Sequence, residues 1–400
     1  MAKLSSSNGI EKFPKLRFPE FKEPYRSARL GEIAVLINRT DPKSAAPIMM
    51  LSAGNGFIMQ SDKYSRYNAG QSLKKYILLK KGELAYNHGA SKAKQFGCCY
   101  ELLEDEALIP YVYHCFKVDK NEYTPYVAFL LNNPKIDRQL KRLVSSSARM
   151  DGLLNISFKD YMSINLSLPP YAEQKQVSDF IKRIDERIVI QEQLISSLKK
   201  YKRGLLMHFF SDDTTRQWRQ YTISQIGKVI TGNTPPTNDR SNYDGDLMFC
   251  SPGDIGEQKY ISSTEKRVSP KGFALGRPIP PSSVIVTCIG LIGKLGIATT
   301  DMITNQQINA LIVSEDFDHE FIYYAFENFF PKYRSKVSMQ TLPILSKSEF
   351  EKLLIKVPNL NVQHKISNYL AGMDKRIEQT QQELNVLQDL RRGIIQKLFI

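Results

Sequence analysis

Two stretches of the chain, residues 166–211 and 355–400, carry apolar residues at alternating spacings of four and three. This spacing places the apolar side chains on one narrow stripe of a long helix, which is typical of a helix that pairs with another helix. A proline stands near the start of each stretch, where a helix can begin. At about 1.5 Å per residue, each helix would form a rod of roughly 50 Å. The predicted pairing stripe consists of Val177, Ile181, Ile184, Ile188, Gln191, Ile195 and Leu198 in the first stretch, and of Ile366, Leu370, Met373, Ile377, Thr380, Leu384 and Leu387 in the second.

The second stretch repeats the first. Asp185 aligns with Asp374, and the same shift of 189 positions aligns the rest of the two stretches without a gap. The stripe is polar at the same place in both copies, at Gln191 and Thr380. We interpret this as an internal duplication. An ordinary core helix is the alternative, but a helix this long and narrowly striped usually has a partner, and the obvious partner is its own duplicate.

The order of the segments predicts how the helices run. The chain alternates a globular region, a helix, a second globular region and a second helix, and a compact domain tends to have its two chain ends close together. The two helices should therefore be antiparallel and related by an approximate two-fold axis. Gln191 and Thr380 would then meet midway as a polar layer that sets the register of the pair.

The two globular regions share a plan of short strands in mixed order followed by a helical stretch and a polar loop. We assign them to residues 23–165 and 216–354. Residues 1–22 are rich in Ser, Pro and Lys and have no period, which predicts a flexible leader or a surface strap. The predicted fold class is α+β, with two similar globular domains separated by two long antiparallel helices, a coiled-coil rod with a pseudo-two-fold internal repeat.

Charge and cysteine usage narrow the class of protein. The formal net charge is +14, and 20 Tyr and 20 Phe accompany it. A chain this basic indicates a polyanionic partner, with a merely solubilising surface charge as the alternative. The five cysteines are odd in number and show no CxxC pairing, so they are expected to be reduced thiols. With no signal-peptide pattern and no membrane-length apolar run, we expect a soluble, cytoplasmic protein without a membrane partner.

Three segments resemble catalytic motifs without meeting their chemistry. Leu168 begins a Leu-Pro-Pro-Tyr sequence where amino-methyltransferases need a polar first residue, and leucine cannot hydrogen-bond a target amino group. Glu257 and Lys259 form a Glu-x-Lys tripeptide of the kind found in nucleases, although such tripeptides are common in surface turns. The glycine turn at 290–294 is too short for a phosphate-binding loop. The five histidines have no metal-ligand spacing. We therefore predict no catalytic residue, no metal and no cofactor in this chain.

Several loops have the composition of a nucleic-acid interface. They combine basic residues with Ser, Thr, Asn and Gln, which suit contacts to phosphates and to base edges. A solvated loop is the alternative for each one. The candidate DNA-binding residues are Lys74, Lys75, Asn87, Ser91, Lys92, Lys94 and Arg149 in the first domain, and Thr234, Asn238, Arg240, Lys294, Asn305, Gln306 and Gln340 in the second.

The chain resembles the specificity (S) subunits of type I restriction–modification enzymes over nearly its whole length. The resemblance rests on the duplicated arrangement, on Gln174 and Gln363 near the helix starts, on the Thr-Gly-Asn-Thr-Pro sequence at 231–235 and on Thr-Asn-Gln at 304–306. The first domain lacks the Gly-x-Thr-Pro loop. Val362 also replaces the glutamate that usually precedes the second of these glutamines.

The resemblance implies two target-recognition domains that bind a split, asymmetric site on double-stranded DNA. It also implies two methyltransferase (M) subunits on the central helices, with S-adenosylmethionine bound by those partners, and restriction (R) subunits joining later. Apolar residues that lie off the pairing stripe agree with a partner surface on the helices. They are Phe180, Ile190, Leu194, Phe209, Tyr369 and Leu398, and the alternative is that the domains fold back and cover them.

Two other classes of protein stay open at this point. A stand-alone methyltransferase or nuclease would act on DNA by itself. A structural nucleic-acid-binding coiled-coil scaffold would not discriminate between duplexes that differ only in two short blocks of sequence.

Overall fold

The computed structural model describes residues 13–63, 70–89, 91, 94–144, 154, 156–256, 258–337 and 343–400. The chain divides into two compact units. Unit 1 comprises Met1–Gln191 with Glu383–Ile400, and unit 2 comprises Glu192–Gln382. Each unit has its own sheets and its own apolar core. The two long helices, α6 (Tyr171–Phe209) and α11 (Leu360–Leu398), each contribute one part to unit 1 and one part to unit 2.

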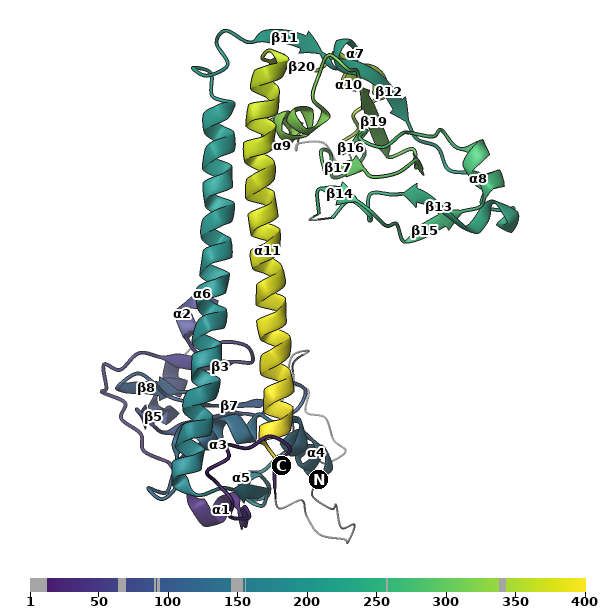
Figure 1. The fold of residues 1–400 in the computed structure, drawn as a ribbon. Coiled ribbons are helices and arrows are strands. Elements are labelled where there is room, and N and C mark those ends of the chain that lie inside the picture. The colour runs from purple at the N-terminus through teal and green to yellow at the C-terminus, as the bar shows by residue number, and fades with distance from the viewer. Residues whose placement is uncertain are drawn as a thin grey trace. The chain divides into compact units, whose positions relative to one another are not determined.

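The main sheet of unit 1 has four antiparallel strands in the order β2-β9-β6-β7 (Figure 1). Three antiparallel strand pairs accompany it: β1-β10, β3-β4 and β5-β8. The strands are β1 (Arg26–Arg29), β2 (Ala34–Leu36), β3 (Met49–Ser52), β4 (Gly56–Met59), β5 (Ile77–Lys80), β6 (Leu84–Asn87), β7 (Cys98–Glu101), β8 (Glu106–Ile109), β9 (His114–Val118) and β10 (Asn165–Leu168).

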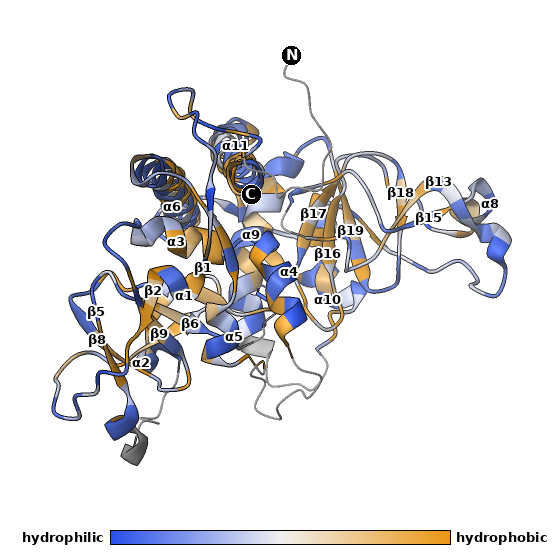
Figure 2. Cartoon of the chain, turned by 90° about the horizontal axis from the view of Figure 1, so that it is seen from below, coloured by the Kyte–Doolittle hydropathy of each residue, from blue (hydrophilic) through white to orange (hydrophobic). Residues whose placement is uncertain are grey.

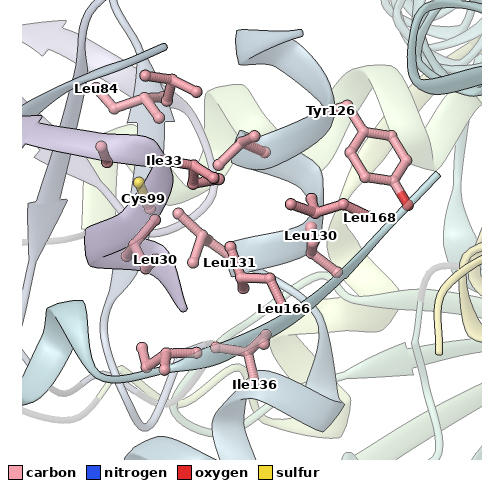
Figure 3. Packing of buried hydrophobic residues seen from close by; sticks show 14 of the residues in the cluster. Leu30, Ile33, Leu84, Cys99, Tyr126, Leu130, Leu131, Ile136, Leu166 and Leu168 are labelled. Carbon is pink, nitrogen blue, oxygen red and sulfur yellow. The ribbon is translucent and has the colours of Figure 1, made fainter. Parts of the chain in front are cut away.

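Short helices accompany the strands of unit 1. They are α1 (Leu30–Ile33), α2 (Gln60–Lys63), the 3-10 helix η1 (Gly70–Lys75), α3 (Thr124–Leu131), α4 (Pro134–Leu143) and α5 (Phe158–Met162). Of these, α1 and α3 contact the main sheet. Figure 3 shows how α1, β6, β7 and α3 form the core, with Leu30, Leu84, Cys99 and Leu131 directed toward one another. These residues are fully or almost fully buried. Their removal from water stabilises the unit by roughly 1.5–3 kcal/mol for each large side chain.

Unit 2 contains a five-stranded sheet in the order β12-β19-β16-β17-β14 and a three-stranded sheet in the order β15-β13-β18. β11 and β20 form a separate antiparallel pair. The strands are β11 (Arg219–Thr222), β12 (Gly227–Thr231), β13 (Tyr243–Cys250), β14 (Tyr260–Ile261), β15 (Lys266–Val268), β16 (Val284–Thr287), β17 (Leu295–Ala298), β18 (Met302–Thr304), β19 (Ile308–Val313) and β20 (Leu354–Val357).

The central strand β16 of unit 2 is buried on both faces, so its sequence Val-Ile-Val-Thr does not alternate between apolar and polar. Figure 2 shows the hydrophobic residues concentrated on β16, β17 and β19. α9 packs over β16 and β17. The helices of the unit are α7 (Ile223–Ile226), the 3-10 helix η2 (Arg240–Asn242), α8 (Pro270–Leu275), α9 (His319–Val337) and α10 (Lys347–Lys352).

The duplication extends into both units, where it covers the elements that begin and end each one. In each unit a strand leads into a one-turn helix and then an edge strand of the main sheet: β1-α1-β2 in unit 1 and β11-α7-β12 in unit 2. In each unit a short helix, α5 or α10, then precedes the strand that pairs with the first one, and the long helix follows. The predicted α+β fold, with two similar domains and two long helices, is confirmed at the level of its elements.

The long helices run antiparallel inside each unit. In unit 1, Asp185 pairs with Arg391 and Gln191 donates a hydrogen bond to Glu383 at 2.8 Å, so one residue number falls as the other rises. In unit 2, Lys202 binds Asp374 at 2.7 Å. All fourteen predicted stripe residues are buried or half-buried in the structure. The Thr380 hydroxyl donates to the backbone carbonyl of Arg376 in its own helix, and a Gln191–Thr380 layer stays a prediction.

The starts of both long helices differ from those expected, since residues 354–357 form strand β20 and α11 begins only at Leu360. Residues 165–168 form strand β10 rather than the start of the long helix, because the residue before Pro169 is biased toward extended backbone. In the described part of the predicted leader, residues 13–22 pack as a strap. Arg17 makes two hydrogen bonds to Glu173, at 2.8 and 2.7 Å, and the Leu16 N–H donates to the Lys397 carbonyl at 3.0 Å.

Candidate nucleic-acid interface and helix surface

In unit 2, the loop after β12 is held against the turn between β18 and β19. Gly232 lies so close to that turn that a Cβ atom would come within 2.1 Å of the Thr304 carbonyl oxygen. Two residues later, the Thr234 hydroxyl donates to the side-chain oxygen of Gln306 at 2.7 Å. Asn305 closes the turn by accepting the Gln307 N–H at 3.0 Å. Three of the predicted DNA-binding residues, Thr234, Asn305 and Gln306, therefore lie together.

A second turn, residues 288–294 between β16 and β17, lies beside this pair of loops. The Cys288 N–H donates to the Gln307 carbonyl at 2.8 Å, which links the two turns. Lys294 is half-buried, and its ammonium group lies 3.5 Å from the Pro252 carbonyl. The loops at 232–234, 288–294 and 305–307 thus form one surface, which we call the unit 2 loop surface.

The two remaining described candidates of unit 2 lie around η2. Asn238 and Arg240 are exposed. Between them, Asp239 binds Lys271 at 2.8 Å and caps the Ser241 N–H at 3.0 Å. The hydrogen bond from Lys271, with those from Ser241, lowers the pKa of Asp239 to about 2. This carboxylate is therefore charged at neutral pH and is already neutralised by a protein cation, which leaves Arg240 available to a phosphate.

In unit 1, the exposed Lys74 and Lys75 end the 3-10 helix η1, and the Lys75 ammonium lies 5.7 Å from the centre of the Tyr111 ring. Asn87 instead has a local role, because its side-chain oxygen accepts the Gly89 N–H at 2.9 Å. Ser91 is exposed and accepts the Lys94 N–H at 3.0 Å. The predictions for Lys92, Arg149 and Gln340 fall outside the described residues.

Lys94 is less available to a DNA phosphate than an exposed lysine would be. Its ammonium group donates to the Asn132 carbonyl at 2.9 Å, and the residue is half-buried. A bound phosphate would have to replace this hydrogen bond. The structure therefore favours Lys74 and Lys75 over Lys94 as exposed cations of unit 1.

A repeated glutamine joins each domain to its long helix. The side-chain oxygen of Gln174 accepts the Tyr123 N–H at 2.9 Å, and the side-chain amide of Gln174 donates to the Pro169 carbonyl at 2.9 Å. Gln363 makes the equivalent hydrogen bonds: its side-chain oxygen accepts the Asp318 N–H and its amide donates to the Pro358 carbonyl, both at 2.9 Å. Tyr123 and Asp318 immediately precede α3 and α9. The sequence marked these glutamines as a repeated feature but could not show what they bind.

A buried charge network in unit 2 was not predicted from the sequence. The Lys202 ammonium lies 2.9 Å from Glu327 and 2.7 Å from Asp374, and the Tyr324 hydroxyl donates to Asp374 at 2.6 Å. Burial alone would lower the pKa of Lys202, but the Glu327 and Asp374 carboxylates outweigh burial and raise it. The network joins α6, α9 and α11 and holds the domain on its helices.

The same network explains the Glu-x-Lys tripeptide. Lys259 is almost buried, and its ammonium group binds the Glu320 carboxylate and the Tyr324 hydroxyl, the latter at 2.9 Å. The ring centre of Tyr324 lies 4.4 Å from the same ammonium. Lys259 is thus held inside unit 2, which gives it a structural role. Glu257 lies outside the described residues.

The helix residues predicted to bind a partner differ in their exposure to solvent. Ile190 and Tyr369 are 62% and 49% exposed, and Leu194 is also exposed. Phe180 is less exposed, at 36%, because Phe18 of the strap packs edge-on against it, with ring centres 5.8 Å apart. Phe209 is half-buried against the core of unit 2.

Leu398 does not fit the partner surface. It is only 3% exposed because it packs into the core of unit 1, where the neighbouring Phe399 contacts Tyr126. The prediction for Leu398 was therefore wrong. Helical spacing alone could not show that the last turn of α11 is covered by the domain.

Among the described residues, no group of three or more His, Cys, Asp or Glu side chains is placed to hold a metal ion. Within the same part of the chain, no helix combines the length and the apolar character needed to cross a bilayer.

Comparison with known proteins agrees with this architecture. The type I restriction modification DNA specificity domain matches residues 215–389. The chain is 27% identical over 191 residues to the type I restriction enzyme MjaIX specificity subunit of Methanocaldococcus jannaschii, covering 46% of this chain and 44% of the relative. It is 31% identical over 110 residues to the HindI specificity subunit of Haemophilus influenzae, covering 27% of this chain and 24% of the relative. These two matches span less than half of each relative.

Solved structures share the fold over nearly the full chain. The type I restriction-modification S subunit from M. genitalium has a TM-score of 0.61 and 14% identity, covering 97% of this chain and 99% of that one. A chain from another type I R-M system has a TM-score of 0.58 and 17% identity, covering 95% and 99%. The family match lies mostly in unit 2, and unit 1 repeats the elements that begin and end unit 2. The chain thus resembles the type I restriction–modification specificity subunits, in sequence over residues 215–389 and in fold over nearly its whole length.

Proposed function

We propose that this chain is the DNA-recognition subunit of a type I restriction–modification complex. Its two units act as target-recognition domains, and each binds one half of a bipartite, asymmetric site on double-stranded DNA. The specificity-domain match in unit 2, together with the same framing elements at the start and end of unit 1, carries this proposal. Because the frame is repeated while the loops differ, each unit binds a different sequence. The chain supplies recognition in the cytoplasm, and the methylation and cleavage chemistry belongs to its partners.

The loop chemistry supports DNA as the ligand. The unit 2 loop surface brings Thr234 and Gln306 together at its edge, and both side chains can donate to and accept from base edges. Arg240 and the lysines of η1 supply exposed positive charge for phosphates. The rigid backbone beneath Gln306 fixes its position before DNA arrives, which reduces the entropy lost on binding.

The helices supply the second half of the proposal, the binding of two methyltransferase subunits. Exposed apolar residues lie on α6 and α11 in each unit. In unit 1 they include Phe180, Ile190 and Leu390, and in unit 2 they include Leu194 and Tyr369. Repetition of the helices predicts that one kind of partner binds twice. S-adenosylmethionine would be bound by these partners, and restriction subunits would join through them.

The first experiment tests recognition. The chain is expressed with its methyltransferase subunits, and the modified bases in the host DNA are sequenced. We expect one bipartite motif, and no methylation by the chain alone. Methylation by the purified chain, or methylation without any sequence preference, would contradict the proposal.

The second experiment tests assembly. Phe180→Asp and Tyr369→Asp should each weaken methyltransferase binding by at least tenfold, because a buried unpaired carboxylate replaces an apolar contact. Stoichiometry measured by analytical ultracentrifugation should fall from two partners per chain to one in each single variant. Val35→Asp and Leu354→Asp are the controls, since both residues are comparably exposed but lie on β2 and β20. Equal binding by all four variants would rule out the helix surface.

A further inference from the structure

One exposed apolar side chain, Leu291, lies on the unit 2 loop surface, and a second, Ile344, lies on the segment next to it. Leu291 and Ile344 are each 56% exposed. Ile344 forms a β-bridge with Ile289, two residues before Leu291, so the two exposed side chains belong to neighbouring segments. Neither residue figured among the predicted DNA contacts. Together they offer an apolar contact beside the polar side chains of this surface.

The backbone that presents Leu291 is fixed. Gly290 and Gly293 have positive φ angles of 72° and 79°, a conformation that glycine adopts without strain. The Thr287 hydroxyl donates to the Leu291 carbonyl at 2.5 Å and accepts the Lys294 N–H at 2.9 Å. The next side chain, Ile292, is buried in the core of unit 2. Leu291 therefore projects from a rigid turn rather than from a loop that could fold it away.

The segment of Ile344 is anchored just as firmly. The Gly290 N–H donates to the Pro343 carbonyl at 3.0 Å, and the Leu345 N–H donates to the Cys288 carbonyl at 2.8 Å. Leu345 itself is buried. Each of the two segments thus carries one exposed aliphatic side chain. Two backbone hydrogen bonds, one on each side of the Ile289–Ile344 bridge, hold the segments together.

Position and charge identify the ligand. Cys288, in the same turn, donates to the carbonyl of Gln307, so Leu291 belongs to the surface that carries Gln306 and Thr234. Lys294 lies at the other end of the turn. On a chain proposed to bind DNA, a surface with polar amides, a cation and an aliphatic pair fits the major groove of a duplex. There the C5-methyl group of thymine is the exposed apolar group.

We propose that Leu291, supported by Ile344, contacts a thymine methyl group in the half-site bound by unit 2, and so determines specificity for thymine at that position. This inference rests on the proposed function. The contact distinguishes thymine from cytosine and from uracil, because neither of them carries a methyl group at C5. Uracil differs from thymine in this group alone, whereas cytosine also has an amino group in place of the O4 carbonyl.

Replacement of thymine by deoxyuridine tests the contact, because it removes the methyl group and keeps the base pair. Each thymine of the two half-sites is replaced in turn, and the affinity of the complex with its methyltransferase subunits is measured. One replacement should weaken binding by the wild type about fourfold, the equivalent of about 0.8 kcal/mol for one buried methyl group. Leu291→Ala should bind the thymine duplex at least fourfold more weakly and should no longer distinguish thymine from uracil there.

Leu354→Ala is the matched control, because Leu354 is an exposed leucine of the same unit on β20. It should keep both the affinity and the fourfold difference, and thermal unfolding should show that both variants are folded. The inference is overturned if Leu291→Ala keeps the difference, if it weakens all duplexes equally, or if no thymine shows a difference. In these cases sequence-specific binding persists. Loss of specific binding by the wild type itself would instead contradict the proposed function.

Discussion

At the scale of single residues, Gly232 shows what the recognition loop requires of the sequence. Its Cα approaches the turn between β18 and β19 so closely that an added Cβ would lie 2.1 Å from the Thr304 oxygen and 2.4 Å from the Asn305 oxygen. Both neighbours are backbone atoms and cannot move independently of the strands. The glycine is thus needed for space, and the Thr234–Gln306 hydrogen bond depends on the resulting approach.

Gly232→Ala should therefore separate the two loops. We expect a loss of about 1–3 kcal/mol in the free energy of unfolding, as in other overpacked sites. At fixed conditions this corresponds to a melting temperature lower by roughly 2–10 °C. Gly253→Ala is the control, because its added Cβ would meet only the Ser251 hydroxyl at 3.8 Å. The melting temperature checks stability, and an unchanged value for Gly232→Ala would contradict the close packing.

At the scale of elements, equivalent positions of the two long helices carry unequal ion pairs. Arg391 of α11 pairs with Asp185 in unit 1, and both side chains are about one-third exposed. Lys202 of α6 occupies the equivalent position in unit 2, where it is 12% exposed between Glu327 and Asp374. Both copies of the repeat thus contain the ion pair, but only the pair in unit 2 has a buried cation.

Burial should decide the cost of removing each cation. Arg391→Met should lower the free energy of unfolding by about 1 kcal/mol or less, since exposed pairs contribute little. Lys202→Met should cost about 3–5 kcal/mol, because it leaves two carboxylates without their buried partner. Denaturant unfolding of both variants measures the difference. Similar losses would mean that the Lys202 network is open to solvent, and high salt should reduce only the Arg391 effect.

The helices and their repeat could be predicted from the sequence because a stripe of apolar residues is a local pattern. The stripe also indicated which positions are buried, from Val177 to Leu387. The partners of Lys202 and Lys259 could not be predicted, because Glu327, Tyr324 and Glu320 come from α9, which is distant in sequence. Loop composition likewise indicated Thr234 and Gln306 as candidates but gave no indication that they meet.

At the scale of the whole molecule, the repeated frame implies that specificity is modular. Each unit has its own core, and Gln174 or Gln363 joins it to its helix through the same hydrogen bonds. The segment from Tyr25 to Ser167 should therefore be replaceable by the equivalent domain of a related specificity subunit. Such an exchange should change one half of the methylated motif and leave the other half intact. A change in both halves, detected by sequencing the modified bases, would contradict modular recognition.

The buried thiols offer a way to follow the two units separately. Cys98, Cys99 and Cys115 lie in unit 1, and Cys250 and Cys288 lie in unit 2, all buried. Burial raises the pKa of Cys98 and of Cys288 to about 11, so neither reacts readily as a thiolate at neutral pH. Alkylation of each cysteine therefore requires its surroundings to open. The rate of labelling, measured by mass spectrometry of the labelled peptides, would report the rate of opening in each unit of the wild-type chain. Cys288, which hydrogen-bonds Gln307, would show whether DNA closes the recognition loops.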